Sequence, residues 1–186
     1  YQPSVRREER NRRTIFAYHC RGLADPFLEL FNQPNPNESC ELRDDASVTP
    51  QALTLLNSEF MSDRAVALAD ELIRTSGDDA IAIRKAFHRI LGREPVDVEI
   101  QQLLKFLRDT VENHERELAA RAEYPTEITR SLVEEFSGKP FEYREILPKF
   151  TDYEADLKME DLSLRGRGLA DVCLLLMNTN EFLFVD

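Results

Sequence analysis

The sequence contains little of what disulfide-bonded, metal-binding or repetitive proteins are built from. Its 186 residues include 6 glycines, 3 cysteines, 3 histidines and no tryptophan. So few glycines exclude a collagen-like class, and three widely spaced cysteines without a CxxC pair give neither a disulfide framework nor a zinc-binding pattern. No run of about 20 apolar residues is present, so the sequence predicts no membrane span.

Motifs for catalysis and cofactor binding are also missing. The three histidines form no HExxH pair, and the chain has no GxGxxG, Walker, GxSxG or haem-attaching CxxCH motif. The acidic run from Asp152 to Asp156 has some likeness to a calcium loop, but Leu157 stands where the turn requires glycine. We therefore expect no catalytic residue, no metal site and no cofactor in this chain.

Charge is abundant and unevenly distributed. The chain carries a net charge of −11, whereas residues 1–13 hold five arginines and two glutamates, a local charge of +3 that leaves −14 for the remainder. Such an acidic body repels phosphate backbones, so we expect no nucleic-acid partner. Residues 1–13 are predicted to be a solvated, Arg-rich lead-in from an upstream domain; the alternative is an anion-binding arm.

The most apolar stretch lies near the end of the chain. From Leu169 to Met177 the one polar residue is Asp171. An apolar surface on every side predicts a helix that is buried on every side, and nine residues are too few to cross a bilayer, which needs roughly 20. We therefore expect a central core helix over 169–177, ended at Asn178, with the other helices antiparallel around it.

Helical periodicity and capping residues predict the surrounding helices. Their expected ranges are 27–31, 50–57, 58–75, 79–91, 96–122 and a helix from about 126 that ends at Gly138. The expected N-caps are Asp25, Thr49 and Ser58. Three helices are expected to end at asparagines, Asn32, Asn57 and Asn178, because this residue tolerates the left-handed conformation. His114 lies on the apolar face of the 96–122 helix, where we expect a hydrogen-bonded histidine at the edge of the core.

Two short runs have a composition typical of strands. Residues 14–18 and 182–185 can pair and bring the two termini together; the alternative is that each packs as an extended segment. The predicted fold class is therefore mainly α, a helical bundle-like domain around a buried C-terminal helix, with at most this two-stranded pairing. Residues 14–186 are predicted to be a single domain, in which 123–168 is an inserted subdomain or an excursion over the surface.

The polar loop over 32–48 is the best candidate for a specific binding site. The candidate binding residues in and beside it are Asn37, Ser39, Arg43 and Gln51. The alternative is that the Asn and Ser side chains satisfy buried backbone groups in a tight loop. Cys20 and Cys40 can form a disulfide if the protein is exported, and Cys173 is expected to be a small buried apolar residue.

Five stretches, in a fixed order, resemble a known family. They are RRTIFAY (12–18), DPFLELFNQPNPNESC (25–40), TPQALTLLNSEF (49–60), FHRILGREP (87–95) and LADVCLLLMNTNEFLFVD (169–186). Together they look like the C-terminal domain of unknown function of large planctomycete proteins that carry a planctomycete-type cytochrome c module near the N-terminus. The positions that match the family's pattern are Arg12, Arg13, Cys40, Arg43, Gln51 and Asn57. Residues 96–168 do not match it.

The resemblance implies an exported protein, periplasmic or at the cell surface, whose haem is held by the upstream module and not by this chain. The family has no established catalytic residues to carry over. The leading hypothesis is a non-catalytic structural or interaction module whose partners are the upstream domains of the same polypeptide. The alternative is that the chain contributes a glycan- or substrate-binding surface, at the 33–48 loop with Arg43 and Gln51, to an extracellular enzyme of polysaccharide or redox metabolism.

Overall fold

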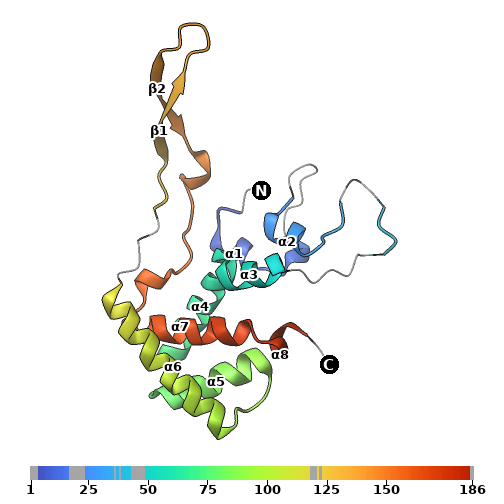
Figure 1. Ribbon diagram of the computed structural model, residues 1–186, viewed down its shortest axis with the longest axis vertical. Coiled ribbons are helices and arrows are strands. Elements are labelled where there is room, and N and C mark those ends of the chain that lie inside the picture. The colour runs from blue at the N-terminus through green and yellow to red at the C-terminus, as the bar shows by residue number, and fades with distance from the viewer. Residues whose placement is uncertain are drawn as a thin grey trace. The chain divides into compact units, whose positions relative to one another are not determined.

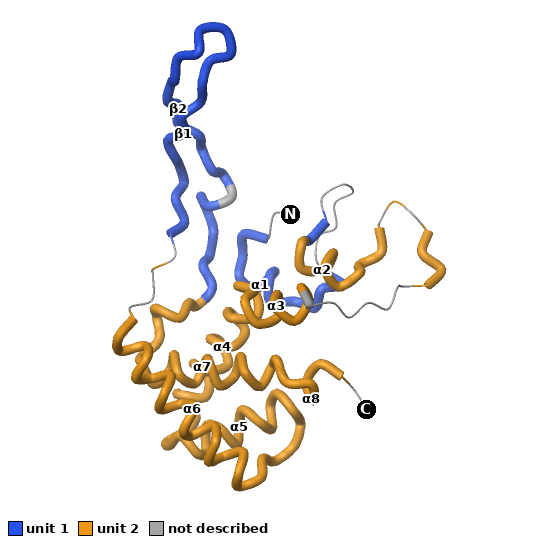
Figure 2. The backbone as a smooth tube through the Cα atoms, in the orientation of Figure 1, with its two compact units in different colours: residues 1–25, 122–156 blue, residues 26–121, 157–186 orange. Residues whose placement is uncertain are grey.

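The computed structural model describes residues 4–16, 24–35, 37, 39–42, 49–117, 121 and 123–184. Across these residues the chain is mainly helical, as predicted, with one two-stranded antiparallel sheet (Figure 1). Two compact units are present: unit 1 comprises residues 1–25 and 122–156, and unit 2 comprises residues 26–121 and 157–186 (Figure 2). The predicted lead-in and most of 123–168 therefore lie in the same unit, whereas the predicted domain boundaries stay a prediction.

Unit 2 contains the helices that form the core. They are α2 (Pro26–Leu30), α3 (Thr49–Asn57), α4 (Glu59–Thr75), α5 (Asp79–Leu91), α6 (Asp97–Arg116), α7 (Leu164–Met177) and α8 (Asn180–Leu183), with the 3-10 turn η3 (Met159–Asp161) ahead of α7. Helix α7 packs against α4, α5 and α6 (Figure 1). The largest fully buried side chains come from all four of these helices and include Val66, Ile83, Leu107, Leu169 and Val172.

Helix α7 is the predicted core helix, and it begins earlier than the sequence suggested. The Ser163 side chain accepts a hydrogen bond from the Gly166 N–H at 3.2 Å and so caps the helix one turn before Leu169. The apolar composition had predicted burial on every side, but Leu175 is 40% exposed. One face of α7 therefore borders solvent while the rest forms the centre of unit 2.

Capping residues set the ends of several helices; Ser58 and Asn32 act as predicted, whereas Asn178, expected to be left-handed, has a φ of −106°. The Ser58 side chain accepts from the Met61 N–H at 3.2 Å, and the Asp78 side chain accepts from the Ile81 N–H at 3.0 Å. Gly92 closes α5 with a φ of 72°, and Asn32 after α2 has a φ of 56°. Helix α6 ends at Arg116, shorter than the predicted 96–122 range.

Arg93 fixes the end of the chain to the helices before it. Its guanidinium binds Glu99 near the start of α6, with Nη2–Oε1 at 2.7 Å, and Glu181 of α8, with Nε–Oε1 at 2.6 Å. The hydrogen bonds from Arg93 and from the backbone N–H of Val96 lower the pKa of Glu99 to about 2. One arginine thus holds together the α5–α6 connection and the short terminal helix.

Unit 1 combines the N-terminal residues with a hairpin. Its elements are α1 (Arg7–Arg10), η1 (Thr14–Phe16), β1 (Glu127–Val133), β2 (Pro140–Ile146) and η2 (Pro148–Phe150). Arg10 donates to the carbonyl oxygens of Ser4 and Val5 at 2.8 and 2.7 Å and lies 4.4 Å from the centre of the Tyr153 ring. Its side chain is 10% exposed, so this arginine, at least, is not part of a solvated lead-in.

The predicted pairing of the termini is wrong for the residues that the structure describes. Residues 14–16 form a 3-10 turn and Asn180–Leu183 form α8, so neither run supplies a strand there. Residues 17–18 and 185 lie outside the described part of the chain. The sheet is formed instead by β1 and β2.

The predicted helix over 126–136 is also wrong, because residues 127–133 form β1. The spacing of Ile128, Leu132 and Phe136 predicts the inward face of a helix, but Ile128 and Leu132 equally share one face of β1, and Phe136 lies beyond the strand. The β-branched residues of EITRSLV favour the strand, and Gly138, with a φ of 66°, lets the chain turn back into β2. Phe136, expected to face inward, is 99% exposed.

Candidate functional site

The residues predicted to bind a ligand in the 32–48 loop are partly engaged in holding the loop itself. The backbone N–H of Asn37 donates to Oδ1 of Asn35 at 3.1 Å, a turn closed by a side chain. Gln51 of α3 donates from Nε2 to the carbonyl oxygen of Leu30 at 3.0 Å and so ties α3 to the end of α2. Ser39 is exposed, and Arg43 lies outside the described residues. Glycan or substrate binding by this loop stays a prediction.

Of the two cysteine predictions, one is confirmed and the other stays a prediction. Cys173 is buried, as expected, and burial raises the pKa of its thiol to about 12. Cys40 is exposed, with its sulfur 3.1 Å from the carbonyl oxygen of Leu42. Cys20 lies outside the described residues, so its pairing with Cys40 stays a prediction.

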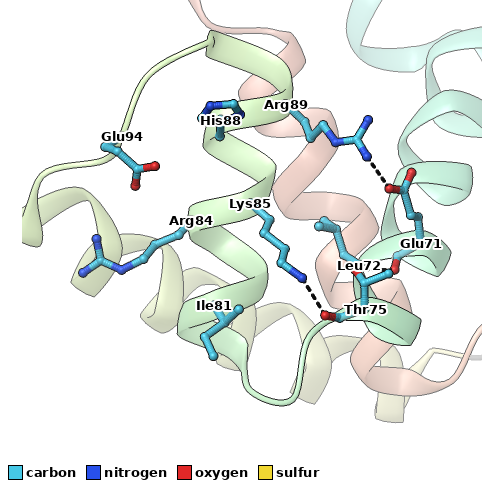
Figure 3. Close-up of a pocket in the computed structure, with 9 residues that line it drawn as sticks. All are labelled: Glu71, Leu72, Thr75, Ile81, Arg84, Lys85, His88, Arg89 and Glu94. Atoms are coloured by element: carbon cyan, nitrogen blue, oxygen red, sulfur yellow. Dashed lines mark hydrogen bonds and ion pairs between the residues drawn. The ribbon is translucent and has the colours of Figure 1, made fainter.

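A groove of about 490 Å³ runs along α5 and is a candidate site in unit 2 (Figure 3). We call it the α5 groove. It is lined by Glu71, Leu72 and Thr75 of α4, by Ile81, Arg84, Lys85, His88 and Arg89 of α5, and by Glu94 after α5. The basic residues recur at i and i+4 on α5, a spacing that brings side chains to one face of a helix.

Two of these basic residues hold α5 to α4. Arg89 pairs with Glu71, with Nη2–Oε1 at 2.6 Å, and the Lys85 ammonium donates to the carbonyl oxygen of Thr75 at 2.5 Å (Figure 3). The second contact satisfies a backbone carbonyl at the end of α4, which has no partner within its own helix. A lysine at this position also suits the negative end of the helix dipole.

Arg84 and His88 are less tightly held. The closest acid to Arg84 is Asp97, with Nη2–Oδ1 at 3.9 Å, and the Asp97 side chain is 93% exposed, so the pair is weak. Among the described residues no hydrogen bond reaches the His88 ring. Figure 3 shows Arg84 and Glu94 on the side of α5 that is away from Glu71 and Thr75. Arg84 and His88 are therefore the basic side chains that an anionic ligand meets first.

The electrostatic character of the groove differs from that of the chain. Three cationic side chains and one histidine face two carboxylates in the groove, whereas the whole chain carries −11. Counting only Arg, Lys and Glu, the lining carries 3 − 2 = +1, so the groove attracts an anion more than the acidic surface around it does. The arrangement therefore favours a carboxylate or another anionic group.

His114 and Asp171 form the second polar pair of interest, at the edge of the core. The Nε2 atom of His114 on α6 lies 2.7 Å from Oδ2 of Asp171 on α7, which confirms the expected hydrogen-bonded histidine at the core edge. Burial raises the pKa of Asp171, and the hydrogen bond to His114 offsets part of that effect. The pair joins two core helices.

The described part of the chain offers no other obvious chemistry. No group of three His, Cys, Asp or Glu side chains is placed to hold a metal ion there. None of the helices in the described ranges is both long enough and apolar enough to cross a membrane.

A family model supplies the identification. The model of PSD1, described as a protein of unknown function (DUF1553), matches residues 1–107. The chain belongs to the PSD1 family. Comparison with curated proteins and with solved structures gives no match. The PSD1 match spans all nine residues of the α5 groove and ends within α6. The 169–186 stretch, which supported the resemblance seen in the sequence, lies beyond the matched range.

Proposed function

We propose that this chain is a non-catalytic interaction module of a larger exported protein whose upstream module carries haem. In this proposal the α5 groove holds an acidic segment from a neighbouring domain of the same polypeptide. The observation that carries it is the cationic groove in a strongly acidic chain. An acidic partner is attracted to this groove and repelled by the acidic surface that makes up most of the chain.

The roles of the polar pairs that join helices support a non-catalytic module. His114 and Asp171 join α6 to α7. Lys158 binds Asp63 at 2.8 Å and Glu59 at 2.6 Å, and thereby joins the segment before α7 to α4. Each of these groups has a partner that fixes one helix to another. Charge pairs of this kind set the packing of helices and leave the groups engaged rather than poised for proton transfer.

The spacing within the groove suits an acidic peptide. Arg84 and His88 are one helical turn apart, which places their Cβ atoms about 6 Å from each other. Carboxylates of a flexible acidic segment reach both positions. Ile81, which is 44% exposed, adds apolar surface for the stems of the ligand side chains.

Binding of a fluorescent hexaglutamate peptide tests the proposal. Exposed charge pairs contribute about 0.2–1 kcal/mol each, so the double variant Arg84→Ala/His88→Ala is expected to bind roughly two- to thirtyfold more weakly. The control is Arg74→Ala/Arg116→Ala, which removes two exposed arginines that lie in surface pairs outside the groove. Affinity for the wild-type chain is expected to fall as salt is added. Equal binding by the two double variants would show that the groove is not the site.

A further inference from the structure

Among the described residues of unit 1, the β1–β2 hairpin has apolar surface and strand edges without partners. Its register pairs Leu132 with Phe141 and Arg130 with Tyr143, and cross-strand partners share a face of the sheet. Leu132, Phe141 and Tyr143 on this face are all exposed. A two-stranded hairpin alone is marginally stable in water, and each of its strands presents unpaired N–H and C=O groups along one edge.

The hydrogen bonds at the two ends of the hairpin determine which backbone groups face the free edge of β2. Glu134 donates to the carbonyl oxygen of Lys139 at 3.0 Å, and Leu147 donates to that of Thr126 at 2.8 Å. Hydrogen-bonded pairs alternate along an antiparallel ladder. The backbone groups of residues 141, 143 and 145 therefore face β1, and those of Glu142, Arg144 and Ile146 face outward.

We propose that β2 is the interface of a symmetric dimer, in which two copies of this chain join their hairpins into a four-stranded antiparallel sheet. The two-fold axis passes beside Tyr143. Glu142 then lies opposite Arg144 of the second copy, and the symmetry makes this pair twice. Residues 142 and 144 are also the ones whose backbone groups point outward, so the same register forms the ladder hydrogen bonds.

Charge selects this register over its neighbours. A shift by two residues in one direction places Glu142 opposite Glu142 of the second copy, and a shift in the other direction places Arg144 opposite Arg144. Like charges directly opposite each other destabilise a sheet. The register centred on Tyr143 avoids both, and it makes strand β2 complementary to itself.

The other edge is a poorer partner. Symmetric pairing through the middle of β1 places Arg130 opposite Arg130 of the second copy, a contact between like charges. Arg130 also pairs with Glu145 within its own hairpin. Pairing of β1 with β2 of another copy is head-to-tail and does not close into a dimer. The proposal concerns the hairpin of unit 1 and does not depend on the α5 groove.

Charge reversal at exposed positions tests the dimer without disturbing the core. Sedimentation equilibrium is expected to show a concentration-dependent dimer for the 186-residue chain. Glu142→Arg or Arg144→Glu alone is expected to weaken association about tenfold, because each change places like charges opposite each other at two symmetric pairs. The double variant Glu142→Arg/Arg144→Glu restores opposite charges and is expected to dimerise as the wild type does. Glu112→Arg makes the same change of charge on α6 and serves as the control.

A cross-link locates the axis. Residues opposite each other at a non-hydrogen-bonded position have Cα atoms about 4.5 Å apart, within disulfide range. In a Cys20→Ser/Cys40→Ser background, Tyr143→Cys is expected to give a covalent dimer on mild oxidation, whereas Thr129→Cys on β1 is not. A wild-type chain that is monomeric at all concentrations, single variants that associate as the wild type does, or equal cross-linking from the two cysteine positions would each overturn the proposal.

Discussion

At the scale of single residues, the pair of His114 and Asp171 shows what the sequence reveals and what it leaves out. The apolar stripe of the 96–122 segment placed His114 at the edge of the core, and this position is confirmed. The stripe gave no sign of its partner, because α6 and α7 are separated by the hairpin in sequence and meet in the fold. Asp171 was visible as the one polar residue in an apolar run, without a stated reason for being there.

The raised pKa of Asp171 predicts a specific pH dependence. In the unfolded chain this carboxyl ionises near its ordinary pKa of about 4, whereas burial holds the proton longer in the folded chain. Stability contributed by this group is therefore present below pH 4 and is lost as the pH rises toward the folded pKa. Asp171→Asn removes the titration, so the wild type should lose stability relative to this variant over that window.

Urea unfolding of both proteins between pH 3 and pH 7 measures the effect, with Asp70→Asn on the surface of α4 as the control. A wild-type advantage that grows with pH would mean that His114 dominates and lowers the pKa of Asp171 instead.

At the scale of helices and strands, two glycines let α7 approach its neighbours closely. A Cβ atom at Gly168 would lie 2.7 Å from Leu107 Cδ1 and 2.7 Å from Val111 Cγ2, and one at Gly166 would lie 2.6 Å from Ile73 Cδ1. Contacts this short force neighbouring side chains to move in a densely packed core. The two glycines therefore allow close packing of α7 because they have no side chain.

Gly168→Ala should destabilise the protein even though alanine is the better helix former. Overpacking costs about 1–3 kcal/mol, and the gain in helix propensity is about 1 kcal/mol, so a net loss of up to about 2 kcal/mol is expected. Gly77→Ala is the matched control, because a Cβ atom there meets nothing within 4 Å. Thermal unfolding distinguishes the two variants. A Gly168→Ala protein as stable as the control would show that α6 and α7 are less closely packed than described.

The elements that the sequence predicted well are those whose signals are local. Helix α5 was predicted with its observed bounds because its periodic core residues stop at Gly92, which closes it. Strand β1 was missed because the spacing of its apolar residues fits both kinds of element, and Gly138, which turns the chain into β2, also suits the end of a helix. Local caps can be read from a sequence, whereas strand partners cannot.

At the scale of the whole chain, the core does not follow the family boundary. The PSD1 match covers α4, α5 and most of α6, and these helices bury Val66, Ile83 and Leu107 against α7, which lies beyond the match. The apolar faces of the matched helices thus need α7 to be covered. The apolar composition of 169–177 predicted this central role, because the burial of apolar surface alone is enough to place such a segment in the core.

The α5 groove, in contrast, was not predicted. Its cations at 84, 85, 88 and 89 are visible in the sequence at helical spacing, but charged helix faces are usually just solvated. What distinguishes this face is the approach of Glu71 and Thr75 from the end of α4, a tertiary contact. The sequence pointed instead to the 32–48 loop, where the described side chains of Asn37 and Gln51 hold local structure.

Native-state amide hydrogen exchange tests most directly the claim that α7 completes the core. The amides of Val172, Cys173 and Leu176 should exchange only through global unfolding, with the same opening free energy as those of Val66 in α4 and Ile83 in α5. Exchange of the α7 amides at a clearly lower free energy, while α4 and α5 stay protected, would show that those helices form a stable core without α7 and would contradict the account.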